Sequence, residues 1–209
     1  MRKINQIVAI AFIILAAISC KKEENIEQGA TVKTDNTDVA AQRIVSLSGA
    51  VTEVVAALGH ENKIVGVDVT STYPESVAKS AKALGHVGRS VSIETIMALK
   101  PTLILGTDED MTPELLSKIK ASGVRSVIFS QEFTVDGAKK LIADVAGALG
   151  HTGDIKPIQD KIDTDRQGLT KFEKAPKVLF IYARGANMLM VSGTGTQMDS
   201  MIQLAGGAN

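Results

Sequence analysis

The stretch from Arg43 to Pro74 constrains the fold more than any other part of this sequence. Arg43 to Leu47 is rich in β-branched residues, a turn of small residues follows it, and Ile64 to Val67 is a second short apolar run. Between the two runs, apolar residues at helical spacing predict a short helix: Val51, Val54, Val55 and Leu58. A strand, a helix and a second strand in this order predict two parallel strands joined by a crossover helix.

The loops after these two strands are where the sequence predicts a functional site. Ligands of open α/β sheets bind beyond the carboxyl ends of the strands. The first loop is Ser48 to Ala50, and the second runs from Asp68 to Pro74 and is rich in hydroxyl groups. We therefore expect a site where these two loops meet.

The alternation of strands and helices continues beyond Pro74 and predicts an α/β fold with a parallel sheet and right-handed crossovers. Ser92 is expected to cap a helix over Ile93 to Leu99, and Thr112-Pro113-Glu114 places a capping hydroxyl before a proline at a second helix start. Gly123 is expected to close that second helix. The other expected elements are helices over Glu75 to Ala83 and Asp136 to Leu149, and strands over Leu103 to Leu105 and Val127 to Phe129.

The pattern changes after residue 153. An apolar stripe predicts a helix from Asp154 to about Lys174, which would be about 30 Å long at 1.5 Å per residue. Asp165 interrupts the stripe, so a shorter helix that covers the core is the alternative. Two strands and a helix are expected to follow, over Val178 to Tyr182, Met188 to Val191 and Gln197 to Leu204. These last segments are too short to bury a core of their own, since domains below about 40 residues usually need added support.

Residues 1–19 have the pattern of a signal peptide. Arg2 and Lys3 precede twelve apolar residues, Ile7 to Ile18, and this run is shorter than the roughly 20 residues needed to span a bilayer. The segment Leu-Ala-Ala-Ile-Ser-Cys resembles a bacterial lipobox, so the single cysteine, Cys20, is predicted to carry a lipid anchor. A plain secretory signal is the alternative. The polar segment 20–42 is interpreted as a flexible linker, and its start also resembles a signal for display on the cell surface.

The composition excludes several classes of function. The charges balance, with 23 basic and 23 acidic residues, and this argues against a nucleic-acid partner. The sequence contains no nucleophile elbow, no phosphate-binding loop that ends in Lys-Ser/Thr and no pair of histidines at metal-binding spacing. Binding is therefore predicted in preference to catalysis.

Two segments carry a resemblance to a known family. They are Ser-Leu-Ser-Gly-Ala-Val-Thr-Glu, which starts at Ser46, and Val-Gly-Val-Asp-Val-Thr-Ser-Thr-Tyr-Pro, which ends at Pro74. Together with a block from Leu189 to Asn209, they resemble the haem-binding branch of the substrate-binding proteins that serve ABC importers of haem, iron siderophores and cobalamin.

This resemblance implies an α/β protein that binds its ligand between two lobes. The first lobe would be 43–153, a long interdomain helix 154–174, and the start of an incomplete second lobe 175–209. Haem would be a transported ligand and not a catalytic cofactor. The partners would be the importer's permease and ATPase, reached from the periplasmic side of a membrane to which the protein is lipid-anchored.

The resemblance also implies which residues contact the ligand. Tyr73 follows a strand end and is the implied haem-iron ligand, since phenolate oxygen suits ferric iron, whereas packing against Pro74 is its alternative role. His86 leads into Val-Gly-Arg where many haem-binding members carry Val-Gly-Tyr, so His86 is a second candidate ligand. Arg89, at the position of that tyrosine, would pair with a haem propionate or lie on the surface.

Three further positions complete the implied site, and one lies outside it. Ser48 lies in the first loop, while Tyr182 and Arg184 follow the first strand of the second lobe and would face the ligand from the other side. Glu114 matches an acidic residue that docks on permease arginines, and it would in any case stabilise the positive end of its helix.

Three readings compete with a haem-binding importer subunit. Within the family, the ligand would be cobalamin or a ferric siderophore. From a different class, the chain would be a secreted α/β enzyme whose catalytic residues lie in a further segment. The third reading is a surface lipoprotein that scavenges haem without an importer. Two other histidines, His60 and His151, follow helix-closing glycines in the tetrad Ala-Leu-Gly-His, and we expect both imidazoles on the surface.

Overall fold

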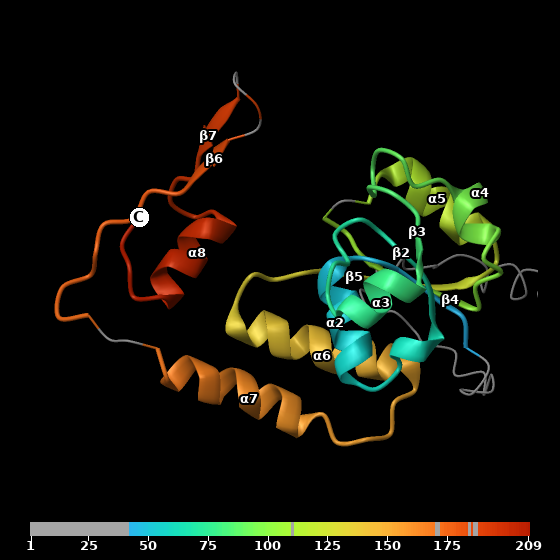
Figure 1. Ribbon diagram of the computed structural model, residues 1–209, viewed down its shortest axis with the longest axis horizontal. Helices are drawn as coiled ribbons and strands as arrows, with labels where there is room; N and C mark the ends of the chain where they lie inside the picture. Colours follow the sequence, from blue (N-terminus) through green and yellow to red (C-terminus); the bar gives the residue numbers. More distant parts are fainter. Residues whose placement is uncertain (1–41, 110, 170–171, 184, 186–187) are drawn as a thin grey trace, which may run out of the picture. The chain divides into compact units, whose positions relative to one another are not determined.

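The computed structural model describes residues 42–109, 111–169, 172–183, 185 and 188–209 (Figure 1). The predicted signal peptide, Cys20 and nearly all of the linker lie outside the described residues. The strands are β1 Ile44–Leu47, β2 Ile64–Val67, β3 Lys82–Ala83, β4 Leu103–Thr107, β5 Arg125–Phe129, β6 Ile181–Ala183 and β7 Leu189–Val191. The helices are α2 Gly49–Ala57, α3 Glu75–Ser80, α4 Ile93–Met97, α5 Pro113–Ala121, α6 Val135–Leu149, α7 Lys156–Gln167 and α8 Gln197–Leu204, with a 3₁₀ turn at Glu61–Lys63.

The first five strands form one parallel sheet in the order β3-β2-β1-β4-β5. The strand β1 lies at the centre and pairs with β4 in continuous register from Ile44 with Leu103 to Leu47 with Gly106. The predicted α/β fold with a parallel sheet is therefore confirmed. From β1 the chain extends the sheet to one side with β2 and β3 and then to the other side with β4 and β5. The loops after β1 and β4 therefore lie side by side at the carboxyl edge of the sheet.

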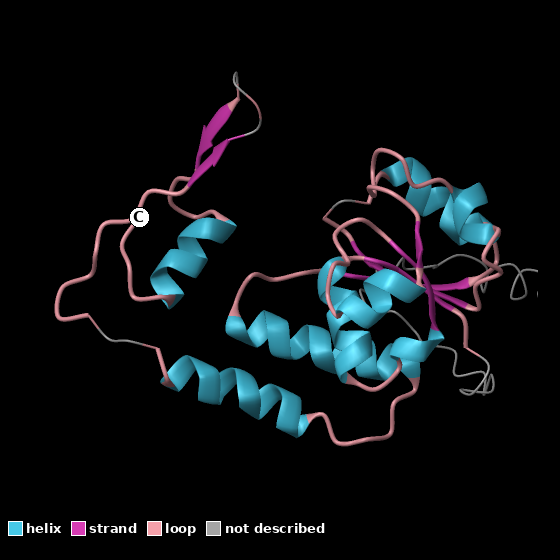
Figure 2. Cartoon of the chain, viewed as in Figure 1, coloured by secondary structure: helices cyan, strands magenta, loops and turns pink. Residues whose placement is uncertain are grey.

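Helices cover both faces of this sheet (Figure 2). The side chains of β1, β2 and β4 alternate between two apolar clusters. Ile44, Leu103 and Leu105 pack with α2, α3 and α6 on one face. Val45 and Ile104 pack with α4 and α5 on the other. This double coverage explains why the strands read as continuous aliphatic runs, since neither face meets solvent.

The predicted helix caps are present. Ser92 Oγ accepts a hydrogen bond from Thr95 N, and Thr112 Oγ1 accepts one from Leu115 N. Gly123 has φ +74° just after α5, the left-handed conformation that glycine adopts at low cost. These short-range signals locate the helix starts to the residue, because they depend only on local sequence.

Two elements differ from the prediction. The segment predicted as helix to Ala83 stops at Ser80, and Lys82–Ala83 forms the edge strand β3 beside Gly66 and Val67. The helix predicted to reach about Lys174 is α7, which ends at Gln167 after 12 residues. Gly168 follows directly, and glycine costs about 1 kcal/mol in a helix relative to alanine.

The helix α7 packs along α6. Ile155 and Ile158 contact the apolar cluster, Lys139 Nζ lies 2.6 Å from Asp163 Oδ2, and Gln159 Nε2 donates to the Lys139 carbonyl oxygen. The described part of the chain after α7 contains the antiparallel pair β6 and β7 and then α8, which has its predicted bounds. The strand β6 starts at Ile181, three residues after the predicted start at Val178. No helix among the described residues has both the length and the apolar character needed to cross a bilayer.

The helices α2 and α6 end in the same tetrad and share a contact that the sequence analysis missed. At each end the histidine N–H donates to the carbonyl of the residue five positions earlier, Val55 for His60 and Ala146 for His151, which is the Schellman pattern. The two imidazoles then meet, with His60 Nε2 at 3.1 Å from His151 Nδ1. The expectation that His60 lies on the surface is wrong, since only 8% of the residue is exposed.

The His60 imidazole is held in its neutral form. Lys63 Nζ lies 3.1 Å from His60 Nδ1, and because an ammonium only donates, Nδ1 accepts and Nε2 carries the hydrogen that His60 donates to His151. Burial lowers the pKa of His60 below the ordinary value of 6.5, and the positive charge of Lys63 and the neighbouring His151 lower it further.

This arrangement predicts acid sensitivity of the fold. A histidine with a lowered pKa in the folded state binds protons more readily when unfolded, so its contribution to stability is present above about pH 6.5 and is lost as pH falls below it. Urea unfolding at about pH 7.5 and about pH 5.5 should show a lower free energy of unfolding at the acid pH.

The variant His60→Gln should lose most of this difference between the two pH values, because glutamine does not titrate. His86→Gln, which removes an imidazole elsewhere in the lobe, is the matched control and should keep the difference. Equal pH dependence in wild type and His60→Gln would contradict the assignment.

Candidate functional site

A buried carboxylate organises the loop after β2. Asp68 is 4% exposed, and its two oxygens accept three hydrogen bonds within the loop. Oδ2 accepts from the backbone N of Thr70 at 3.1 Å and from Thr70 Oγ1 at 2.6 Å, while Oδ1 accepts from Ser71 Oγ at 2.8 Å. Because an ionised carboxylate in a buried position requires several donors, these contacts fix the conformation of the loop.

A row of hydroxyl groups connects this loop to the first strand and helix. Thr52 Oγ1, on α2, lies 2.8 Å from Ser46 Oγ on β1 and 2.8 Å from Ser71 Oγ in the loop after β2. Ser46, Thr52 and Ser71 are all buried. The row therefore ends on the Asp68 carboxylate and joins the two loops that the sequence singled out.

Gly49 is the point where the two loops touch. Its backbone N–H donates to Thr70 Oγ1 at 2.9 Å. A Cβ at this position would lie 2.7 Å from the carbonyl oxygen of Thr70, closer than real Cβ contacts, so the approach requires glycine. The first residue of α2 is thus held against the second loop.

A polar pocket of about 360 Å³ opens over these loops, and we name it the cleft-face pocket. Its lining comes mainly from residues at or just beyond the carboxyl ends of β1, β2, β4 and β5, where a parallel sheet places ligands. The lining residues are Leu47, Ser48, Gly49, Ala50, Glu53, Thr70, Thr107, Glu109, Gln131, Phe133 and Gln197.

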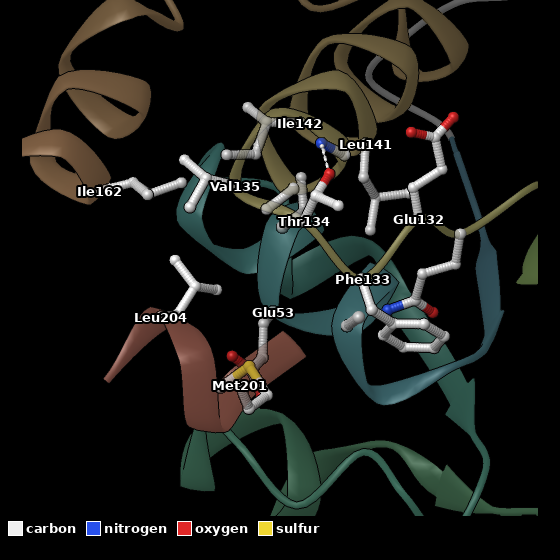
Figure 3. Close-up of a pocket in the computed structure, with 15 residues that line it drawn as sticks. Glu53, Glu132, Phe133, Thr134, Val135, Leu141, Ile142, Ile162, Met201 and Leu204 are labelled. Atoms are coloured by element: carbon white, nitrogen blue, oxygen red, sulfur yellow. Dashed lines mark hydrogen bonds between the residues drawn. The ribbon is translucent and has the colours of Figure 1, made fainter. Parts of the chain in front are cut away.

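An apolar pocket of about 410 Å³ adjoins it (Figure 3). Ala50, Glu53, Gln131 and Phe133 line both pockets, so the two adjoin at the start of α2. The rest of the apolar pocket is lined mainly by aliphatic side chains, which include Val135, Leu141 and Ile142 on α6, Ile162 on α7, and Met201 and Leu204 on α8. The combined space has one polar end and one apolar end, an arrangement suited to a large amphipathic ligand.

Comparison with known proteins identifies the family of the chain. Residues 44–209 match the family model described as periplasmic binding protein. The chain belongs to this family.

Solved structures of similar proteins share the fold. The periplasmic haem-binding protein RhuT from Roseiflexus sp. RS-1 is 36% identical, with a TM-score of 0.75, over 81% of this chain and 65% of that protein. The periplasmic haem-binding protein HutB of Vibrio cholerae is 30% identical, with a TM-score of 0.72, over 81% of this chain and 65% of that protein.

A curated relative has a different ligand in its name. The vitamin B12-binding protein of Vibrio cholerae serotype O1 is 29% identical over 174 residues, which are 81% of this chain and 60% of the relative. The chain thus spans less than two thirds of the length of each of these proteins.

The sequence-predicted residues of this periplasmic binding protein do not all gather at one place. Ser48 lines the cleft-face pocket. Tyr73 lies in the loop after β2 and is 64% exposed, but it is not among the residues that line that pocket. His86 lies in the turn after β3, and its Nδ1 is 2.7 Å from the Val87 carbonyl oxygen. A carbonyl only accepts, so Nδ1 carries the hydrogen and Nε2 keeps a lone pair that can coordinate a metal.

Arg89 and Glu114 line the same surface pocket of about 290 Å³, between the turn after β3 and α5. Lys118 also lines it, with Nζ 2.7 Å from Glu114 Oε1. This hydrogen bond and the lysine charge lower the pKa of the Glu114 carboxyl. Arg89 is thus a neighbour of the expected docking residue and is not among the residues lining the cleft-face pocket.

The predicted residues of the second lobe are only partly visible. Tyr182 lies in β6 opposite Met190 and is 46% exposed, while Arg184 and Cys20 lie outside the described residues. In the described part of the chain, no three His, Cys, Asp or Glu side chains are grouped so that they could hold a metal ion.

Sequence reasoning missed three residues that shape the site. Asp68 and Thr52 hold the loops together, and Glu53 lines both pockets. An aspartate that directly follows a buried strand and precedes Thr-Ser-Thr was an available signal, because such hydroxyls often pair with a local carboxylate. Glu53 lies one turn beyond Gly49, so it faces the same side of α2 as the loop.

Proposed function

We propose that this chain is the substrate-binding component of an ABC importer and that it captures a metal tetrapyrrole on the carboxyl edge of its parallel sheet. The observation that carries the proposal is the cleft-face pocket, which adjoins an apolar pocket large enough to take part of a macrocycle. The family match supports a binding and delivery role without chemistry.

Haem is the first candidate ligand. The names of RhuT and HutB, which share the fold of this chain, describe haem binding. Tyr73 is the proposed iron ligand because its phenolate is a hard oxygen donor and 64% of the residue is exposed, and His86 Nε2 is the second candidate. Ser48, Tyr182 and Arg184 are proposed to contact the ligand, and Arg89 to reach a propionate.

Cobalamin is the second candidate ligand. The curated relative from Vibrio cholerae is named for vitamin B12 binding, and cobalamin requires no protein ligand to its metal in order to be carried. The cleft-face pocket also has no lysine or arginine among its lining residues. A ferric siderophore is the remaining alternative within the family.

The proposed setting is the extracytoplasmic side of a membrane. A lipid on Cys20 would hold the protein there, and linker 20–42 would let it reach a permease and its ATPase. Display on the cell surface is the alternative. Glu114 is proposed to dock on the permease, since it is exposed at the start of α5 and has a lowered carboxyl pKa, so it stays ionised.

Replacing Tyr73 by phenylalanine tests the proposed iron ligand. The variant keeps the ring and removes the phenolate, so the haem complex should show a shifted Soret band. Haem affinity should fall by at least about tenfold, the lower end of the loss seen when even an outer partner of a metal ligand is removed. An absorption titration measures both effects.

The matched control is Tyr182→Phe, the same chemical change at the chain's other tyrosine. Because Tyr182 is proposed to contact the ligand and not the iron, its replacement should leave the Soret position unchanged even where affinity falls. Wild-type and Tyr73→Phe proteins with identical haem spectra would exclude Tyr73 as the ligand. Cobalamin binding without haem binding would support the second candidate.

Glu114→Gln tests the docking role. The variant removes a charge that lies on the surface and away from both adjoining pockets, so ligand affinity should be unchanged while import into cells falls severalfold. Glu75→Gln, which also removes one carboxylate of an exposed i,i+4 pair, is the control. Normal import with Glu114→Gln would rule out the proposed docking contact.

A further inference from the structure

The carboxylate of Glu53 lies where the two adjoining pockets meet. It is an exposed residue on α2, one turn beyond the glycine that touches the second loop, and it lines both the cleft-face pocket and the apolar pocket (Figure 3). Among the described residues, no hydrogen bond or ion pair engages its side chain. A ligand that occupies either pocket therefore meets this charge.

The remaining polar lining of the cleft-face pocket adds no positive side chain. Glu109 contributes a second carboxylate, Gln131 and Gln197 contribute amides, and Ser48, Thr70 and Thr107 contribute hydroxyl groups. Carboxylates accept hydrogen bonds and do not donate them. The lining thus offers a negative charge and many acceptor oxygens to whatever binds, while its amides and hydroxyls can also donate.

Such a lining distinguishes tetrapyrroles by the carboxylate or amide groups at the edge of the macrocycle. A porphyrin dicarboxylate such as haem would bring two further negative charges towards Glu53, and like charges in a partly desolvated pocket repel strongly. A corrinoid has primary amides on its rim, whose N–H groups donate to carboxylate and amide oxygens. The aliphatic pocket beside Glu53 accepts the apolar part of either macrocycle.

We infer that Glu53 selects ligands by charge, so that this cleft prefers a tetrapyrrole with a neutral, amide-bearing rim to one with free carboxylates. This inference rests on the proposed function, because it assumes that a tetrapyrrole binds here. The cleft would then prefer the amide-bearing corrinoid to haem, and Glu53 would set this preference.

The test uses two ligand pairs that differ only in carboxylate charge. Haem is compared with haem dimethyl ester, and cobalamin with a cobalamin monocarboxylic acid in which one rim amide is hydrolysed. Affinities of the purified chain are measured for wild type, Glu53→Gln and Glu61→Gln. Glu61→Gln removes the same charge from the 3₁₀ turn before β2, at the opposite edge of the sheet, and is the matched control.

Wild type should bind the neutral member of each pair more tightly. In Glu53→Gln, the ratio of the affinity for the neutral ligand to the affinity for the carboxylate ligand should fall by about tenfold at low salt, chiefly because the carboxylate ligand binds more tightly. This fall should become smaller as salt is added. Glu61→Gln should keep the wild-type ratio.

The inference would be overturned if wild type and Glu53→Gln had the same affinity ratio of neutral to carboxylate ligand. It would also be overturned if Glu61→Gln lowered that ratio as much as Glu53→Gln does. Tight binding of one or more tetrapyrroles with no charge preference would leave the proposed function standing and remove the role of Glu53. Failure of all four ligands to bind would instead remove the proposed function, and the inference with it.

Discussion

The buried carboxylate of Asp68 is the interaction on which the site depends. Three donors from Thr70 and Ser71 satisfy it, and through Thr52 and Gly49 it holds the loop after β2 against the start of α2. Two loops far apart in sequence thereby become one rigid floor for the cleft-face pocket. A pre-formed floor suits a binding protein, since little ordering free energy is then lost when a ligand enters.

Much of the fold could be predicted because its signals are local. The strands β1 and β2 read as short aliphatic runs, and the hydroxyls of Ser92 and Thr112 marked helix starts that the structure confirms. Two elements were predicted wrongly for different reasons. The edge strand Lys82–Ala83 has no pattern of its own and exists because β2 offers a free edge. The helix α7 ends at Gln167 because Gly168 follows it, a local signal that the prediction passed over in favour of the apolar stripe.

The position of the candidate pocket could be predicted, but its lining could not. The loops after β1 and β2 meet, as expected, at the carboxyl edge of the sheet, which is a general ligand position. The lining was not predicted, because the resemblance drew attention to Tyr73 and Arg89, whereas Glu53 lines both adjoining pockets and Arg89 lies beside Glu114. The His60–His151 contact was equally invisible, because nothing in one sequence shows that two repeated tetrads meet in space.

Hydrogen exchange measured with and without ligand tests the central claim that a tetrapyrrole binds on the floor built by Asp68. Bound haem or cobalamin should slow exchange at the amides of residues 49–54, 70–71 and 131–133, and should leave the amides of 61–63 at the opposite edge of the sheet unchanged. Saturation with a ligand that protects other segments while these amides exchange at their free rate would contradict the account.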